Sequence, residues 1–166
     1  MPDPNFVRIN DVPYSWASLR ASIDGDPTWI GGLVGVDYSH KRERKVVYAG
    51  DPAGRPKGKT SGKVSYTLKL KYLVDSAAAL EAYLAIKGAG SYGDANFAFM
   101  LQYVEPVVPP SLPIIITASP CSLMEGKAGH VEGIDEAVTE YDVVVTEILK
   151  NGLPLYSVVR AASILV

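Results

Sequence analysis

A long connection rich in glycine and proline, residues 50–62, interrupts the first half of the chain. It has glycine at positions 50, 54, 58 and 62 and proline at positions 52 and 56, and this composition excludes a helix. Its polar residues also exclude it from a hydrophobic core. Hairpin loops usually contain about 2–5 residues, so a connection of thirteen residues indicates a role of its own. We expect this loop to reach another protein chain.

Segments of strand character flank this loop, so residues 34–74 are expected to form a strand, a long basic loop and a second strand. Val46–Ala49 leads into the loop, and apolar and polar residues alternate from Lys63 to Tyr72. A period of two is typical of a strand with one buried face. The apolar face contains Val64, Tyr66, Leu68, Leu70 and Tyr72, and the polar face contains Ser65, Thr67, Lys69 and Lys71.

The rest of the chain is also mostly of strand character. Further extended segments are expected at 15–23, 29–39, 96–105 and 143–146, with tight turns at Asp24-Gly25 and Asn151-Gly152. Ile114–Ile116 is a short apolar run that Pro120 should end or place at a sheet edge. We expect a polar loop at 126–133.

One helix is expected, over Ala77–Lys87, because these residues have high helix propensity. Asp75 or Ser76 can cap its start, and Gly88 ends it. Its apolar stripe contains Ala77, Leu80 and Leu84, widened by Ala79, Tyr83 and Ile86.

These elements predict a mainly β fold with two packed antiparallel sheets, a sandwich or a barrel, one flanking α-helix and a long inter-strand hairpin loop. The 166 residues are expected to form a single domain. We expect residues 1–13, which are rich in proline, to form an N-terminal arm, and residues 157–166 to form a C-terminal extension.

Composition and the N-terminal sequence limit the cellular compartment that we expect for the protein. Cys121 is the only cysteine, so an intrachain disulfide is impossible and nothing indicates an oxidising compartment. The N-terminal residues have no basic and apolar pattern of a signal peptide. No apolar run approaches the ~20 residues of a membrane span. We therefore expect a protein made in the cytoplasm and not bound to a membrane.

The charges are unevenly distributed although the net charge is only −2. Ten of the sixteen Lys and Arg residues lie between Lys41 and Lys71, where only two residues are acidic. Eight acidic residues lie between Glu105 and Glu147, against one lysine. Surfaces of opposite sign on neighbouring copies of the chain would fit one another. The alternative is two solvated faces without a partner.

Motifs for catalysis or cofactor binding are missing or lack their structural context. Residues 54–60 resemble a phosphate-binding loop, but the glycine spacing is one residue short and a strand follows in place of a helix. Residues 88–93 match GxGxxG, but a helix precedes them and a strand follows, the reverse of a dinucleotide site. His40 and His130 have no Cys or His at ligand spacing. We expect no enzyme activity, no cofactor and no metal.

Several segments, taken in order, resemble the tail tube proteins of bacteriophages, which are related to the tube proteins of contractile tails and type VI secretion. No single motif carries the resemblance, which runs over residues 14–156; the Arg55–Gly58 core of the long hairpin is its most specific part. The matching segments are 15–19, 36–39, 50–62, 75–77, 92–94 and 148–155. The proline-rich segment 105–113 and the apolar tail after Tyr156 depart from the family.

The resemblance implies a structural subunit of a virion tail, assembled in the bacterial host cytoplasm. Six subunits would close a ring, and stacked rings would enclose a channel through which DNA passes without specific binding. Other partners would be the tape-measure, initiator and terminator proteins and, if the tail contracts, a sheath. The long hairpin would then touch an adjacent subunit through Gly50, Asp51, Arg55, Lys57, Lys59 and Thr60.

Charge asymmetry adds one further expectation about the channel. A negative wall would repel the phosphate backbone of DNA. The candidate residues facing the lumen are Glu132, Asp135, Glu136, Glu140 and Asp142. The alternative function is a monomeric β-barrel that binds nucleic acid or a small ligand, since basic surfaces with aromatic residues hold single strands.

Overall fold

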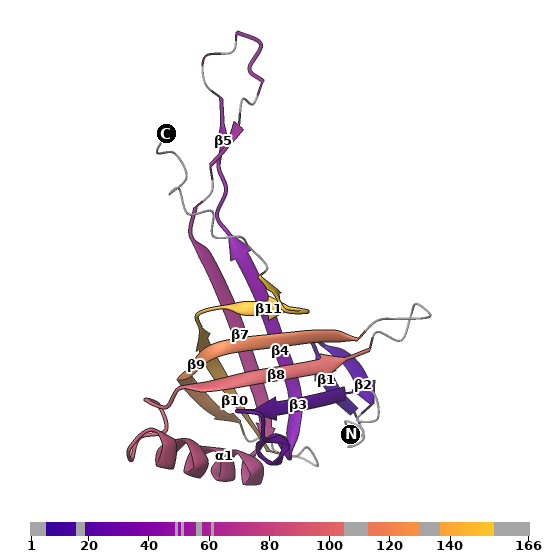
Figure 1. The fold of residues 1–166 in the computed structure, drawn as a ribbon, viewed down its shortest axis with the longest axis vertical. Helices are drawn as coiled ribbons and strands as arrows, with labels where there is room; N and C mark the ends of the chain where they lie inside the picture. The colour runs from indigo at the N-terminus through magenta and orange to yellow at the C-terminus, as the bar shows by residue number, and fades with distance from the viewer. Residues whose placement is uncertain are drawn as a thin grey trace.

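The computed structural model describes residues 6–15, 19–48, 50, 52–55, 58–60, 62–104, 113–129 and 137–154. These residues form strands, one α-helix and one short 3₁₀ helix (Figure 1). In chain order they are β1 (Phe6–Ile9), β2 (Val12–Ser15), β3 (Leu19–Ile23), η2 (Pro27–Ile30), β4 (Leu33–Arg42), β5 (Val46–Val47), β6 (Gly58–Lys59), β7 (Val64–Leu73), α1 (Val74–Lys87), β8 (Phe97–Tyr103), β9 (Ile114–Gly129), β10 (Val138–Val145), β11 (Ile148–Lys150) and β12 (Leu153–Pro154). The expected mainly β fold with one helix is confirmed.

Ten strands form one large sheet that curls over itself, and β5 and β6 form a second, small sheet. The main path runs β12-β11-β9-β10-β7-β4-β1-β2, and β8 with β3 joins on the other side of β9. The long strand β9 therefore belongs to both layers: its first half pairs with β8 and its second half with β10. Figure 1 shows the strands of the two layers crossing each other. The two expected packed layers are parts of one sheet, antiparallel except for the parallel pair β1–β4.

The hydrophobic core fills the space between these layers. Leu68, Leu70 and Tyr72 of β7 are buried, as their alternation predicts, and they face Phe99 and Leu101 of β8 across one buried cluster. The helix α1 closes one end of this core through Ala77, Leu80 and Leu84. Burial of these apolar side chains is the main stabilising contribution to the fold.

The N-terminal segment differs from the extended N-terminal segment that was expected at residues 1–13. Residues 6–15 form a β-hairpin, β1–β2, that extends the main sheet. Its turn is Asn10-Asp11, and both residues have positive φ (47° and 66°), which Asn and Asp tolerate. Pro13 fits because β2 pairs only with β1 among the described strands, and proline is tolerated at sheet edges. Residues 1–5 and the C-terminal extension 157–166 lie outside the described residues.

Pro120 does not end a strand, contrary to expectation, because β9 continues to Gly129. The β8 ladder skips from Ala118 to Cys121, and on the other side β10 ends and β11 begins near this point. The missing N–H of Pro120 therefore falls where neither ladder requires it, while its carbonyl accepts a hydrogen bond from the Thr146 N–H (3.3 Å). Residues 126–129, expected in a loop, belong to the same strand.

The helix begins earlier and buries a narrower face than expected. It starts at Val74 after Leu73, with no side-chain cap, so neither Asp75 nor Ser76 caps it. Gly88 ends it as predicted, through its N–H to the Leu84 carbonyl (2.8 Å). Ile86, expected to widen the buried stripe, is 84% exposed. No helix of the described part of the chain is long and apolar enough to cross a membrane.

Candidate assembly surfaces

The arm, which we define as residues 43–63, continues the β4–β7 hairpin far beyond the body of the protein (Figure 1). The Gly62 N–H donates to the Glu43 carbonyl (2.7 Å), and the Thr60 N–H donates to the Lys45 carbonyl (2.8 Å). The ladder then continues into the β5–β6 pair, in which Val46 lies opposite Lys59. The irregular tip is therefore shorter than the thirteen-residue loop expected from the sequence.

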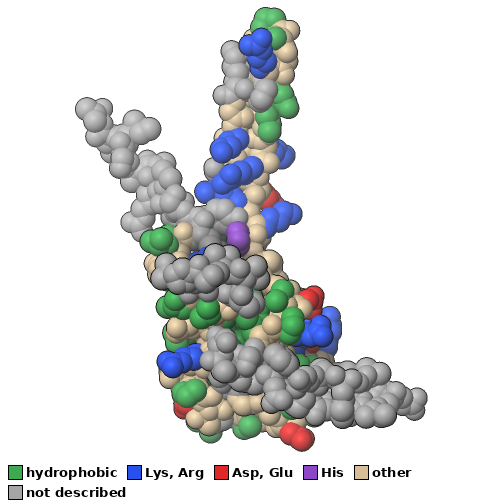
Figure 2. All heavy atoms as spheres, turned by 90° about the vertical axis from the view of Figure 1, so that its right-hand side faces the viewer, with side chains coloured by type: hydrophobic (Ala, Val, Ile, Leu, Met, Phe, Trp, Pro, Cys, Tyr) green, Lys and Arg blue, Asp and Glu red, His purple; other side chains and the backbone are tan. Residues whose placement is uncertain are grey.

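The arm is basic and carries apolar side chains in contact with solvent. Its sequence has six Lys and Arg residues against two acidic residues, and Figure 2 shows Lys and Arg along its length. Val46 is 54% exposed and Tyr48 is 64% exposed. An isolated two-stranded ribbon is marginally stable in water. Exposed apolar side chains of this kind are typical of a surface that a partner covers.

The residues expected at the inter-subunit contact are divided between the ribbon and its tip. Gly50 and Arg55 lie in the tip, where Gly50 has positive φ (59°) and Arg55 is exposed. Lys59 is exposed on β6, and the hydroxyl of Thr60 accepts a hydrogen bond from the Lys45 N–H (3.2 Å). Asp51 and Lys57 lie outside the described residues.

The polar face of the sheet, on β4, β7 and β10, holds a network of ion pairs. The Lys69 Nζ lies 3.0 Å from Glu140 Oε1 and 3.3 Å from Asp142 Oδ1. These two carboxylates raise the pKa of Lys69 through hydrogen bonds and charge. The Lys71 Nζ lies 2.8 Å from Asp37 Oδ2 on the neighbouring strand.

This network bears on the expected lumen residues. Glu140 and Asp142 lie on one face of β10, but they share Lys69 and are not a bare acidic surface. The other three candidates, Glu132, Asp135 and Glu136, lie outside the described residues. The sequence could not reveal the pairing, because the register of β7 against β10 brings together residues about seventy positions apart.

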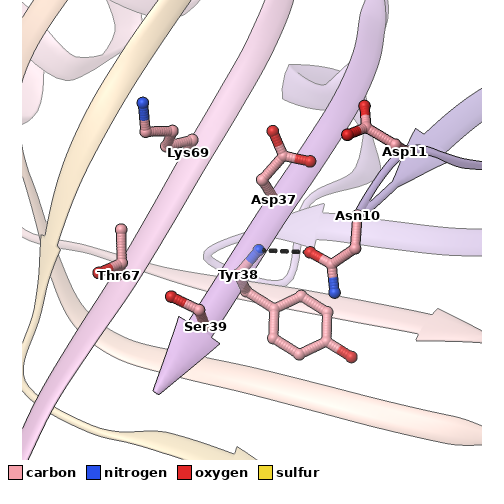
Figure 3. Close-up of a pocket in the computed structure, with 7 residues that line it drawn as sticks. All are labelled: Asn10, Asp11, Asp37, Tyr38, Ser39, Thr67 and Lys69. Carbon is pink, nitrogen blue, oxygen red and sulfur yellow. Dashed lines mark hydrogen bonds between the residues drawn. The ribbon is translucent and has the colours of Figure 1, made fainter. Parts of the chain in front are cut away.

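A shallow hollow of about 320 Å³ lies beside this network, between the β1–β2 turn and strands β4 and β7 (Figure 3). It is lined by Asn10, Asp11, Asp37, Tyr38, Ser39, Thr67 and Lys69. The Tyr38 N–H donates to Asn10 Oδ1 (2.9 Å), so Asn10 fixes the turn against β4. Its polar lining consists of carboxylates, hydroxyls, one amide and one amine.

The foot, which we define as residues 24–30 and 74–96, lies at the end of the molecule opposite the arm (Figure 1). Asp24 ties its parts together by accepting hydrogen bonds from the Tyr83 hydroxyl (2.8 Å), the Ala98 N–H (2.9 Å) and the Lys87 ammonium group. Burial opposes the charge of Asp24, but these hydrogen bonds outweigh it and lower its pKa.

The charge of the foot was not expected from the sequence. It contains five acidic residues, scattered from position 24 to position 94, against Lys87 alone. These acidic residues form no run along the sequence, because they belong to two separate segments. Only the fold brings the two segments together. The sequence did contain one indication of an interaction surface in the foot. Residues 77–86 are apolar on all sides of the helix, which indicates burial on more than one face.

The described residues contain no cluster of three or more His, Cys, Asp or Glu side chains that could hold a metal ion. Cys121 is buried in the core, and its thiol donates to the Ala118 carbonyl (3.3 Å). Burial raises the pKa of this thiol to about 12, which makes it a poor nucleophile.

Comparison with known proteins gives a relation at the level of fold. No protein-family model and no curated protein matches the sequence. A chain of the PVC sheath–tube complex of an extracellular contractile injection system in its extended state is similar, with a TM-score of 0.54 and 14% identity over 84% of this chain and 92% of that one. A chain in the structure of the PVC sheath/tube terminator in its extended state has the same TM-score and identity, over 84% of this chain and 96% of that one.

A chain in the structure of the tube-terminating cap of the anti-feeding prophage is also similar, with a TM-score of 0.54 and 10% identity over 84% of this chain and 91% of the other. At these identities the likeness concerns the path of the backbone and not particular side chains. It extends over most of both chains in each comparison. The protein therefore shares its fold with components of contractile injection systems.

Proposed function

We propose that this protein is the structural subunit of a tail tube, which forms stacked, hexameric rings around a channel for DNA. The arm is the observation that carries this proposal: it is a basic ribbon with exposed apolar side chains that projects from a fold shared with components of sheath–tube complexes. On a monomer this ribbon would leave its strand edges uncovered, and exposed strand edges favour aggregation.

The ring and stack account for the main surfaces of the molecule. Ring closure would pair sheet edges with those of neighbouring subunits and so remove them. The arm would touch an adjacent subunit through its tip, β6 and the residue after it, at Gly50, Arg55, Lys59 and Thr60 among the described residues. Other tail proteins, including terminator and initiator components, would bind the ends of the stack.

The polar face of the sheet is our candidate for the channel wall. Lys69 is shared by Glu140 and Asp142, so this group keeps one net negative charge while its members are held in place by ion pairs. Lysines engaged in this way are less available to phosphates, and the residual negative charge opposes adhesion of DNA. DNA would pass without specific binding.

Electron microscopy of the purified protein, with light scattering after size exclusion, tests the proposal. Hollow tubes or rings of uniform width are expected. The variant Arg55→Glu/Lys57→Glu/Lys59→Glu should stay folded but form no tubes. A control with the same change of charge, Arg8→Glu/Lys127→Glu/Lys150→Glu, alters exposed positions outside the arm and off the edge strands and should assemble. Unchanged assembly of the arm variant would contradict the role of the arm.

A second candidate is a monomeric β-barrel that binds nucleic acid, favoured by the basic arm and the exposed Tyr48. It predicts a monomer at all protein concentrations and an affinity for single-stranded DNA that falls steeply with salt. A titration with DNA at two salt concentrations separates the two functions, because the tube subunit should show no affinity of its own.

A further inference from the structure

We infer that the arm of one copy docks on the outer face of helix α1 in the foot of a second copy, so that the molecules join head to tail. This inference rests on the proposed function, because it assigns the partner surface for the arm. It is carried by the exposed face of α1, by the opposite charges of the two ends and by their positions in the molecule.

The outer face of α1 is apolar and uncovered in the described part of the chain. Ala78, Ala79 and Ala82 are exposed on it, and Ile86 is 84% exposed. Residues 77–86 contain a single charged side chain, Glu81. A surface helix normally presents charged side chains to water, and a helix that is apolar on all sides is normally buried on all sides. The small alanine side chains leave room for a flat ribbon to approach closely.

The arm has the complementary chemistry. Its exposed Val46, Val47 and Tyr48 can cover Ile86 and the alanines. Its six basic residues face a foot with five acidic residues and one lysine. Asp75 and Asp94 are exposed on the foot and make no ion pair with a described residue, so they are available to a neighbouring copy. Opposite potentials on two surfaces favour their association and fix its orientation.

The positions of the two surfaces make the contact repeat. The arm and the foot lie at opposite ends of the long axis (Figure 1). An arm strand of about ten residues spans roughly 33 Å, long enough to cross a boundary between subunits and lie along a helix. A contact between two different surfaces does not close on itself when they face opposite ways, so copies continue to add in one direction. The two surfaces therefore generate a stack with a defined polarity.

Charge reversal on both sides provides the test. The arm variant Arg44→Glu/Lys45→Glu and the foot variant Asp75→Lys/Asp94→Lys should each lose assembly by light scattering and electron microscopy. An equimolar mixture of the two should assemble again, because each reversed surface then meets a surface of opposite sign. A merely structural role for these residues would give no such rescue. Glu125→Lys/Glu147→Lys, with the same change of charge as the foot variant, should assemble alone.

A third variant, Ile86→Asp, tests the apolar part of the contact and should lower the fraction of assembled protein at least tenfold. Thermal unfolding of each variant shows that the subunit remains folded. Tubes formed by the foot variant alone, or a mixture that stays unassembled, would overturn the arm–foot contact. If the unchanged protein still forms tubes in that case, the proposed function stands without this contact. If the unchanged protein and its tail partners form no rings or tubes, the proposed function fails and the contact fails with it.

Discussion

The hydroxyl of Tyr38 on β4 lies 2.6 Å from the hydroxyl of Tyr103 on β8, so a hydrogen bond joins the two layers of the curled sheet. The ring of Tyr103 also meets the ring of Tyr14 on β2 edge to face, with centroids 5.0 Å apart. Tyr103 is buried, and the Tyr38 hydroxyl in the opposite layer is the hydrogen-bond partner of its hydroxyl at the edge of the core.

Replacing Tyr103 by Phe should lower the free energy of unfolding by about 1 kcal/mol, because the Tyr38 hydroxyl loses a partner in a half-buried site. The double variant Tyr38→Phe/Tyr103→Phe should cost less than the sum of the single variants, since it leaves no hydroxyl behind. Urea unfolding measures both, and the exposed Tyr48→Phe serves as a control with no change. Additive losses would show that the two hydroxyls are not coupled.

Asp24 predicts a loss of stability in acid. Burial opposes its charge, but the hydrogen bonds from Lys87, Ala98 and Tyr83 lower its pKa in the folded protein. A lowered pKa stabilises the fold above the unfolded value of about 4, and this contribution is lost as the pH falls through the folded pKa. Asp24→Asn should cost about 1 kcal/mol at pH 7, after allowance for solvent screening.

The same substitution should flatten the dependence of stability on pH below about 4. Asparagine tolerates the positive φ of this position (53°) and can still accept a hydrogen bond from the Ala98 N–H, so the turn is kept. Unfolding curves from pH 7 to pH 2 measure the difference between the two proteins. A constant difference at every pH would mean that the charge of Asp24 does not contribute.

Gly32 sets how closely β4 approaches the start of the helix. It has positive φ (80°), and a Cβ atom at this position would lie 2.0 Å from Ser76 Oγ. Gly32→Ala should therefore lower the free energy of unfolding by about 3 kcal/mol, from steric overlap and backbone strain together. Gly25 has the same φ but open space around it, so Gly25→Ala should cost only about 1 kcal/mol. Equal effects on thermal unfolding would show that overlap with Ser76 is relieved.

Strands with one buried face were predictable from the sequence, because alternation is a local property. Leu68, Leu70 and Tyr72 are buried as the pattern requires, and Phe97, Phe99 and Leu101 follow the same rule on β8. The turns at Asp24-Gly25 and Asn151-Gly152 were equally clear, since positive φ restricts the residues that can occupy them. The helix and its end at Gly88 followed from propensity alone.

Features that depend on neighbouring strands were not predictable. Proline at position 120 predicts the end of a strand, yet β9 continues through it. Its missing N–H falls where the β8 ladder skips and the β10 ladder ends. The pairing of Lys69 with Glu140 and Asp142 depends on a register between distant strands. The basic arm was visible as a run along the chain, whereas the acidic foot arises only when two segments meet. The sequence thus indicated one half of the proposed contact.

Shortening the arm should separate folding from assembly. Residues 48–57 can be replaced by Asn-Gly, which closes the Val47–Gly58 pair with a two-residue turn. The body should keep its free energy of unfolding within about 0.5 kcal/mol, because no described residue of the arm belongs to the core. The shortened protein should form no tubes by electron microscopy. Tubes of normal length would contradict the assembly role of the arm.

Mixtures of the two proteins carry this prediction further. A shortened subunit still has an intact foot, so it should accept the arm of an unchanged copy, but its own arm lacks Tyr48 and the tip and should be too short to hold the next one. Added to the unchanged protein at increasing fractions, it should therefore shorten the tubes progressively, measured as a length distribution in electron micrographs. The shortened protein that also carries Asp75→Lys/Asp94→Lys has neither surface and should leave tube length unchanged. Equal shortening by both proteins would show that arm and foot do not act as a pair.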